Sequence, residues 1–250
     1  MLNGKLVSLG GLTAAAVLGV SLPACAQPSL RFTPFGDSRG AANPPVARYV
    51  AGEGKSFIFD RSPDGSEALL KFDDNPEVWV LQPSPGPGGV TIYRNDVGDP
   101  VVRVTRLGGV TLYTPREPEG VPAALSGDAE DLSPPAFVPN GFLLQRSAQA
   151  SERCSRVAQH LVTIESSNAT PATSPLFLDA ITITSEAIVR LSRRKEAKPF
   201  LSRLEKVLFI TGTRPDVSFN RTVMTVTIAP SKGYAGRPSS DRIAKVAIKH

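Results

Sequence analysis

Residues 89–115 read GVTIYRNDVGDPVVRVTRLGGVTLYTP, and this stretch decides the fold of the first half of the chain. It contains three short runs rich in β-branched and aromatic residues, which are 90–94, 101–105 and 110–114. Turn residues such as Asn, Asp and Gly separate the runs. Short apolar runs divided in this way are typical of antiparallel strands joined by tight turns. The stretch therefore predicts part of an antiparallel β-meander.

The same pattern extends towards the N-terminus. Four more runs of this kind are 48–51, 56–60, 68–72 and 78–82. Turn sequences rich in Gly, Pro, Asp and Asn divide them, so we expect a β-rich region over residues 46–114. Residues 27–45 hold four prolines among Gly, Ser and Asp. We expect them to form a flexible lead-in, because they contain too little apolar surface to offset the cost of ordering the chain.

Residues 115–139 have a different composition. They hold six prolines and five acidic residues, and their apolar residues show no period. This composition predicts a Pro-rich acidic linker that separates the β-rich region from the rest of the chain.

Beyond Gly141 the apolar spacing becomes helical. The residues at helical spacing are Leu143, Ala150, Cys154, Val157, Leu161 and Ile164, and they predict a helix that ends near Ser166. We also expect a helix over 174–193 whose buried stripe is Ile181, Thr184, Ile188 and Leu191. Strands are expected over 206–211 and 222–229, followed by a last helix over 240–249 with Ser239 as its N-cap and Ile243, Val246 and Ala247 on its buried side. Residues 140–250 are thus a helix-rich α+β region with a two-stranded β element. The predicted fold class is α+β.

The first residues have the order of a secretory signal peptide. Lys5 is followed by an apolar run from Leu6 to Leu22 and by the small-x-small cleavage sequence Ala24-Cys25-Ala26, so we expect residues 1–26 to be removed on export. The tetrapeptide that ends at Cys25 also partly matches a lipoprotein processing box, which leaves a lipid-anchored form as an alternative. The apolar run is too short to cross a hydrocarbon core of about 30 Å, so no transmembrane segment is expected.

The two halves of the chain differ in charge. Residues 27–139 hold ten basic and 15 acidic residues, whereas residues 140–250 hold 17 basic and eight acidic residues. The densest basic part consists of Arg190, Arg193, Arg194, Lys195, Lys198, Arg203 and Lys206. Such a cluster suits either a solvated helix end or a surface that binds anionic lipid headgroups or cell-wall polymer. It lacks the interleaved aromatic residues that stack on bases, so no nucleic-acid partner is expected.

Few residues offer catalytic chemistry. Cys154 and His160 are candidates for a thiol nucleophile and its base, but a separation of six residues leaves their side chains about 120° apart around a helix. Cys154 also lies on the apolar stripe, where burial makes a thiol inert, so we expect a structural cysteine. The chain has two histidines, one of them its last residue. We therefore expect no metal site, cofactor or hydrolytic triad.

The block at 89–115 resembles the most recognisable part of an uncharacterised family of exported alphaproteobacterial proteins of similar length, classed as a domain of unknown function. Residues 57–62, 76–80 and 236–243 agree with this resemblance. The resemblance implies a location in the periplasm of a Gram-negative bacterium, and it brings no catalytic residues.

Two functions are compatible with these features. The first is a non-catalytic periplasmic or envelope protein, a binding or accessory module whose basic second half contacts an anionic envelope partner. The alternative is a small periplasmic hydrolase with its site at the domain junction, in which Asp96 and Asp99 act together with Arg103 or Arg106. The lack of a convergent His, Cys or Ser system favours the first.

Overall fold

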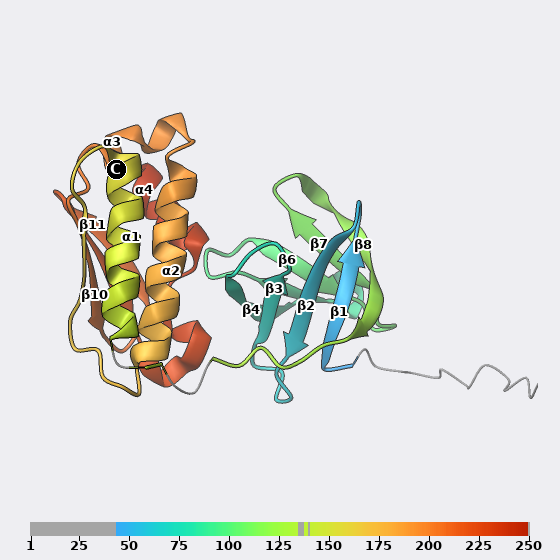
Figure 1. Ribbon diagram of the computed structural model, residues 1–250. Helices are drawn as coiled ribbons and strands as arrows, with labels where there is room; N and C mark the ends of the chain where they lie inside the picture. Colours follow the sequence, from blue (N-terminus) through green and yellow to red (C-terminus); the bar gives the residue numbers. More distant parts are fainter. Residues whose placement is uncertain (1–43, 135–137, 140, 250) are drawn as a thin grey trace, which may run out of the picture. The chain divides into compact units, whose positions relative to one another are not determined.

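The computed structural model describes residues 44–134, 138–139 and 141–249 (Figure 1). The predicted signal peptide over 1–26 and all but the last two residues of the predicted lead-in over 27–45 lie outside this part of the chain. The described residues form a β-rich first half and a second half of helices with a small sheet. The α+β class expected from the sequence is therefore confirmed.

The first half is an eight-stranded antiparallel sheet that closes into a barrel (Figure 1). Its strands are β1 (Val46–Ala51), β2 (Lys55–Arg61), β3 (Ala68–Phe72), β4 (Val78–Pro85), β5 (Thr91–Arg94), β6 (Pro100–Val104), β7 (Val110–Thr114) and β8 (Glu117–Asp128), with a short 3-10 turn η1 (Pro87–Gly89) between β4 and β5. Each strand pairs with the next, and β8 pairs with β1 to close the barrel. The strands β1 to β7 match the runs expected from the sequence, so the predicted meander is confirmed.

Aromatic side chains fill the interior of the barrel. Tyr49 of β1 and Phe57 and Phe59 of β2 are buried, because alternate residues of a strand point to the same face. The Tyr49 and Phe57 rings stack with their centroids 5.6 Å apart, and Phe59 meets Tyr93 of β5 edge-on at 5.1 Å. Each such pair stabilises the barrel by about 0.5–1.5 kcal/mol beyond the burial of its area.

The predicted linker over 115–139 is wrong over residues 117–128, which form β8. This strand pairs with both β7 and β1. Its register shifts next to Gly120, whose φ is +81° and where a Cβ atom would lie 2.7 Å from Thr111 and Tyr113 side-chain atoms. Residues 129–134 follow without helix or strand, and the Leu132 amide donates to the Asp60 carboxylate at 2.9 Å. Proline and acidic content predicted a linker here because β1, one of the two strands that pair with β8, is remote in sequence.

The second half packs helices against a four-stranded sheet. Its elements are α1 (Phe142–Ala158), β9 (Thr163–Ser166), α2 (Ser174–Leu191), η2 (Lys195–Ala197), α3 (Lys198–Leu201), β10 (Lys206–Thr211), β11 (Asp216–Asn220), β12 (Val223–Ile228), η3 (Pro230–Gly236) and α4 (Ser240–Lys249). The strand order is β11-β12-β10-β9, and Figure 1 shows α1 and α2 side by side. The prediction of a two-stranded element is wrong, because β9 and β11 add to it.

The helix α1 is shorter than the sequence predicted. It ends at Ala158 because Gln159 adopts a left-handed conformation with φ of 64°, and its amide bonds to the Ser155 carbonyl. Leu161, which the helical spacing placed on the apolar face, is 72% exposed. Ile164 is buried, but it lies on β9 beside Val207 of β10. A four-residue strand cannot be distinguished from the end of a helix by its apolar spacing alone.

The helices α2 and α4 bury the faces that the sequence predicted. On α2, the predicted stripe of Ile181, Thr184, Ile188 and Leu191 is fully buried. On α4, the Ser239 hydroxyl accepts from the Arg242 amide at 3.1 Å, so Ser239 is the predicted N-cap. Among the described residues, no helix is both long and apolar enough to cross a membrane.

Candidate functional site

The seven basic residues singled out in the sequence do not form one equivalent group. Arg193, Arg194, Lys195 and Lys198 are exposed between the end of α2 and the first residue of α3, and we call these four the cationic segment. Among the described residues, no hydrogen bond or ion pair engages their side-chain charges. Only Glu196 brings an acidic side chain into this stretch. The cationic segment is therefore available to an anionic partner.

The other three basic residues are held by contacts within the protein. Arg190 at the end of α2 donates to the Ser240 hydroxyl at 2.9 Å. The Arg203 guanidinium lies over the Phe219 ring at 5.4 Å and donates to the Pro199 carbonyl. The Lys206 ammonium pairs with Glu165 at 2.9 Å across the strands β10 and β9. These three side chains support the local structure around the cationic segment.

The acidic and basic residues of the alternative hydrolase site do not converge. Asp96 lies in the turn between β5 and β6 and is engaged by the second half of the chain, whereas Asp99 is exposed. Arg106 lies against Gly89, and its guanidinium occupies the space that a Cβ atom there would fill. Within the described part of the chain, no contact joins Arg103 or Arg106 to either carboxylate.

The candidate nucleophile and base are also apart. Cys154 is buried in the core of the second half, and burial raises the pKa of its thiol to about 12. His160 lies beyond the end of α1, and its Nε2 is 2.7 Å from the Leu204 carbonyl oxygen. Because a carbonyl oxygen can only accept, Nε2 is the donor in this hydrogen bond. His160 lines an open hollow of about 490 Å³ together with Thr163 and Lys206, away from the thiol.

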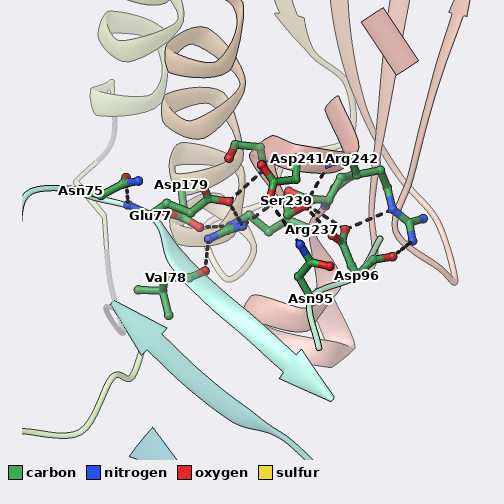
Figure 2. Close-up of polar contacts among 12 residues, drawn as sticks. Asn75, Glu77, Val78, Asn95, Asp96, Asp179, Arg237, Ser239, Asp241 and Arg242 are labelled. Carbon is green, nitrogen blue, oxygen red and sulfur yellow. Dashed lines mark hydrogen bonds and ion pairs between the residues drawn. The ribbon is translucent and has the colours of Figure 1, made fainter. Parts of the chain in front are cut away.

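A polar network that the sequence did not predict joins the barrel to α4 (Figure 2). Asp96 from the barrel accepts hydrogen bonds from the Ser239 amide at 3.1 Å and from the Ser239 hydroxyl. Arg242 binds the same residue twice, through an ion pair of 3.1 Å with the carboxylate and a hydrogen bond of 2.8 Å to the backbone carbonyl. A carboxylate at this place is favourable because a helix N-terminus carries a partial positive charge and unpaired amides.

A second barrel carboxylate binds the same helix end. Glu77, which directly precedes β4, is 2% exposed and accepts from the Ser240 amide at 2.9 Å. Beside it, Asn95 of the barrel donates to the Asp241 carboxylate at 3.2 Å. The barrel therefore caps α4 in trans with two carboxylates, and the helix adds Asp241 in its own first turn.

Arg237 lies at the centre of this network (Figure 2). Its side chain is 2% exposed, donates to the Val78 carbonyl at 2.7 Å and to the Asp179 carboxylate of α2, and lies 3.7 Å from Glu77. Gly236 allows this position, because a Cβ atom there would lie 2.0 Å from the Ala229 carbonyl oxygen. One guanidinium thus links β4, α2 and the segment before α4.

Burial changes the acidity of two carboxyls in the network. The pKa of Glu77 is raised from its ordinary value by burial, and the nearby Arg237 charge offsets this only in part. The pKa of Asp241 is also raised, mainly by burial, while Arg190 acts in the opposite direction. Both groups therefore hold a proton more readily here than in water.

The trans cap can be tested at Asp96. We expect Asp96→Ala to lower the free energy of unfolding by about 1–2 kcal/mol, because the Ser239 amide and Arg242 both lose their acceptor. Asp99→Ala is the matched control on the same turn, and we expect a change within about 0.5 kcal/mol because its side chain is exposed. Urea unfolding followed by the fluorescence of Trp79, the single tryptophan, measures both. Equal losses in the two variants would show that Asp96 is not a cap.

The stretches that carry the family resemblance are also those that build the network. Residues 76–80 supply Glu77 and Val78, the block 89–115 supplies Asn95 and Asp96, and residues 236–243 supply Arg237 to Arg242. No sequence rule indicated that these stretches meet in space. The sequence offered one signal that could have linked them, which is that all three stretches carry the family resemblance.

The fold and these contacts define the class of protein. It is an α+β protein in which a closed antiparallel barrel caps a helix of a mixed α/β unit. The chain belongs to the family described as a domain of unknown function, DUF4908, whose family model matches residues 30–247. This match confirms that the chain falls in an uncharacterised family. A search of curated proteins and a search of solved structures each gave no match.

Proposed function

We propose that this protein is a non-catalytic binding or accessory protein of the bacterial envelope, and that its cationic segment contacts an anionic envelope partner. The supporting observation is that Arg193, Arg194, Lys195 and Lys198 are all exposed within one short segment, with their charges unengaged by other described residues. The polypeptide before and after this segment is anchored by buried residues such as Leu191 and Phe200. A rigidly supported group of charges loses less conformational entropy on binding than a flexible tail does.

The expected affinity is moderate. Each cation near an anionic surface contributes about 1 kcal/mol, so four cations contribute about 4 kcal/mol before the repulsion from Glu196 is subtracted. This interaction depends on salt, because the Debye length falls from about 10 Å at 0.1 M to about 3 Å at 1 M. Binding should therefore be detectable at low ionic strength and should be lost in molar salt.

The envelope location rests on the sequence of residues 1–26, which has the order of a signal peptide. In the periplasm, the polyanions within reach are lipid headgroups and cell-wall polymer. A lipid on Cys25 would add to the same attachment, since one lipid chain alone binds a membrane only marginally. The hydrolase alternative has less support, because the Asp96 carboxylate is already bound to Ser239 and Arg242.

Co-sedimentation tests this proposal. The wild-type protein is mixed at several salt concentrations with vesicles that contain anionic lipid and, separately, with purified cell-wall sacculi. We expect at least one of these surfaces to retain it at 50 mM salt and to release it at 1 M salt. Replacing Arg193, Arg194, Lys195 and Lys198 with Ser should weaken the apparent binding constant at low salt at least tenfold, as expected for a loss of more than about 1.4 kcal/mol.

A second variant separates a local effect from a change in net charge. Arg214, Lys232, Lys245 and Lys249 are also exposed in the second half, and their joint replacement with Ser removes the same charge. We expect this control to bind nearly as well as the wild type. Equal loss in the two variants, or no binding of the wild type to either surface at low salt, would contradict the proposal.

A further inference from the structure

The network between the barrel and α4 contains more acidic than basic side chains. Its carboxylates are Glu77, Asp96, Asp179 and Asp241, and its guanidiniums are Arg190, Arg237 and Arg242. If every group were ionised, the network would carry one excess negative charge in a partly buried place. Ionising a buried carboxyl without a partner is costly, and such groups take up a proton instead.

The distances show which carboxyls lack a close cation. Arg242 lies 3.1 Å from Asp96, and Arg237 is hydrogen-bonded to Asp179. The remaining two carboxyls are farther from their nearest guanidinium. Glu77 lies 3.7 Å from Arg237, and Asp241 lies 3.9 Å from Arg190, whose side chain is 44% exposed. These two are the groups on which an additional proton is best placed.

We propose that docking of the barrel on α4 takes up a proton shared between Glu77 and Asp241, so that the contact between the two halves tightens as the pH falls. The network is then a pH-sensitive clasp. It closes most firmly when one of these two carboxyls is neutral, and it loosens when both are ionised.

The direction of the pH dependence follows from the linkage between proton binding and docking. In an undocked barrel Glu77 would be solvated, and its pKa would return to the ordinary value of 4.5. Docking buries this carboxyl and raises its pKa, so the docked state binds the proton more tightly. The extra stability is fully present below the ordinary pKa and is lost as the pH rises through the raised pKa. Asp241 follows the same rule from its ordinary value of 3.8.

The neighbouring charged groups support this assignment. Facing Glu77 are Arg237 from the segment before α4 and Asp241 from α4 itself. Facing Asp241 are Arg190 from α2, together with Asp96 and Asp99 from the turn between β5 and β6. Both aspartates of that turn oppose the ionisation of Asp241. The turn therefore adds to the pH sensitivity of the clasp.

Hydrogen–deuterium exchange of the full chain tests the clasp between pH 5 and pH 8. The reporters are peptides that cover residues 76–80 and 238–243, with rates corrected for the intrinsic effect of pH on exchange. We expect their opening equilibrium constant to rise with pH, by up to about tenfold per pH unit, as uptake of one proton requires. Glu77→Gln should flatten this dependence, because the amide oxygen still accepts from the Ser240 amide but the side chain no longer titrates.

Asp241→Asn is a second variant that should flatten the dependence in part, and Glu53→Gln on the exposed loop between β1 and β2 is the matched control that should leave it unchanged. An opening constant in the wild type that is flat or falls with pH would overturn the proposal, whether or not the variants fold. The proposal is also overturned if Glu77→Gln and Asp241→Asn both retain the full wild-type slope.

Discussion

Replacing Arg237 with Met is expected to lower the free energy of unfolding by about 3–5 kcal/mol at neutral pH. The Arg237 side chain is 2% exposed. Its guanidinium forms ion pairs with the carboxylates of Asp179 and Glu77 and donates a hydrogen bond to the Val78 carbonyl. Methionine fills a similar volume, so the loss comes from the charge and its hydrogen bonds rather than from a cavity. The substitution would leave the Glu77 carboxylate and the Val78 carbonyl buried without this donor, and such unsatisfied groups are costly.

Urea unfolding followed by Trp79 fluorescence measures this loss. Arg194→Met is the control, because it removes the same charge from an exposed position, and we expect a change within about 0.5 kcal/mol. A loss below about 1 kcal/mol for Arg237→Met would mean that the network tolerates an uncompensated carboxylate, and that Arg237 does not hold the two halves together.

Replacing Cys154 with Asp is expected to cost more than about 4 kcal/mol, which is enough to unfold a marginal protein. Cys154 is fully buried on α1 among apolar residues such as Ala150, Leu176 and Val162. The charge of the neighbouring Arg153 acts on this position, but the Arg153 side chain is 40% exposed and lies 3.8 Å from the Glu186 carboxylate. Cys154→Ala is the matched control, with an expected loss of about 1 kcal/mol, because it removes one sulfur atom and adds no charge.

Thiol chemistry provides a second measurement on the unmodified protein. Because burial raises the pKa of Cys154 to about 12, very little thiolate exists at pH 8, and a thiol reagent should label the native protein far more slowly than the urea-unfolded protein. Equal labelling rates in the two states would show that Cys154 is accessible, and they would contradict its structural role.

The cationic segment and the clasp are neighbours in the structure. Arg190 lies in the last turn of α2 and donates to the Ser240 hydroxyl at the start of α4. The first member of the cationic segment, Arg193, follows three residues later. The segment η2 also packs against α4. A change in the contact between the barrel and α4 would therefore alter the packing next to the cationic segment. The exchange and co-sedimentation experiments test the two proposals separately, because one reads protection at α4 and the other reads bound protein.

The chemistry of neighbouring residues was sufficient to predict most strands of the barrel. Runs such as Ala68–Phe72 and Val110–Thr114 were predicted with the bounds that the structure has, because β-branched residues and the turns between them act within a few residues. It was insufficient for β8, whose prolines and acidic residues resemble a linker. That strand is stabilised by partners on β1 and β7, and its pairing with β1 joins residues that are far apart in the chain.

The residues of the candidate site also divide into those that the sequence identified and those that it did not. Net charge identified the cationic segment, because charge is a property of the residues themselves. Accessibility was not visible in the sequence, and three of the seven predicted residues bind within the protein. Glu77 and Arg237 were missed because each is unremarkable in its own segment, and they become a buried pair only when the barrel meets α4.

The sequence by itself determined the α+β class, the seven-strand meander, the buried stripe of α2, the cap at Ser239 and the unequal charge of the two halves. These depend on interactions within one element or one turn, which neighbouring residues specify. Only the tertiary structure decided the closure of the barrel by β8, the four-stranded sheet and the capping of α4 by Glu77 and Asp96. These depend on contacts between residues up to 163 positions apart, as between Glu77 and Ser240, and such contacts form only when the whole chain packs.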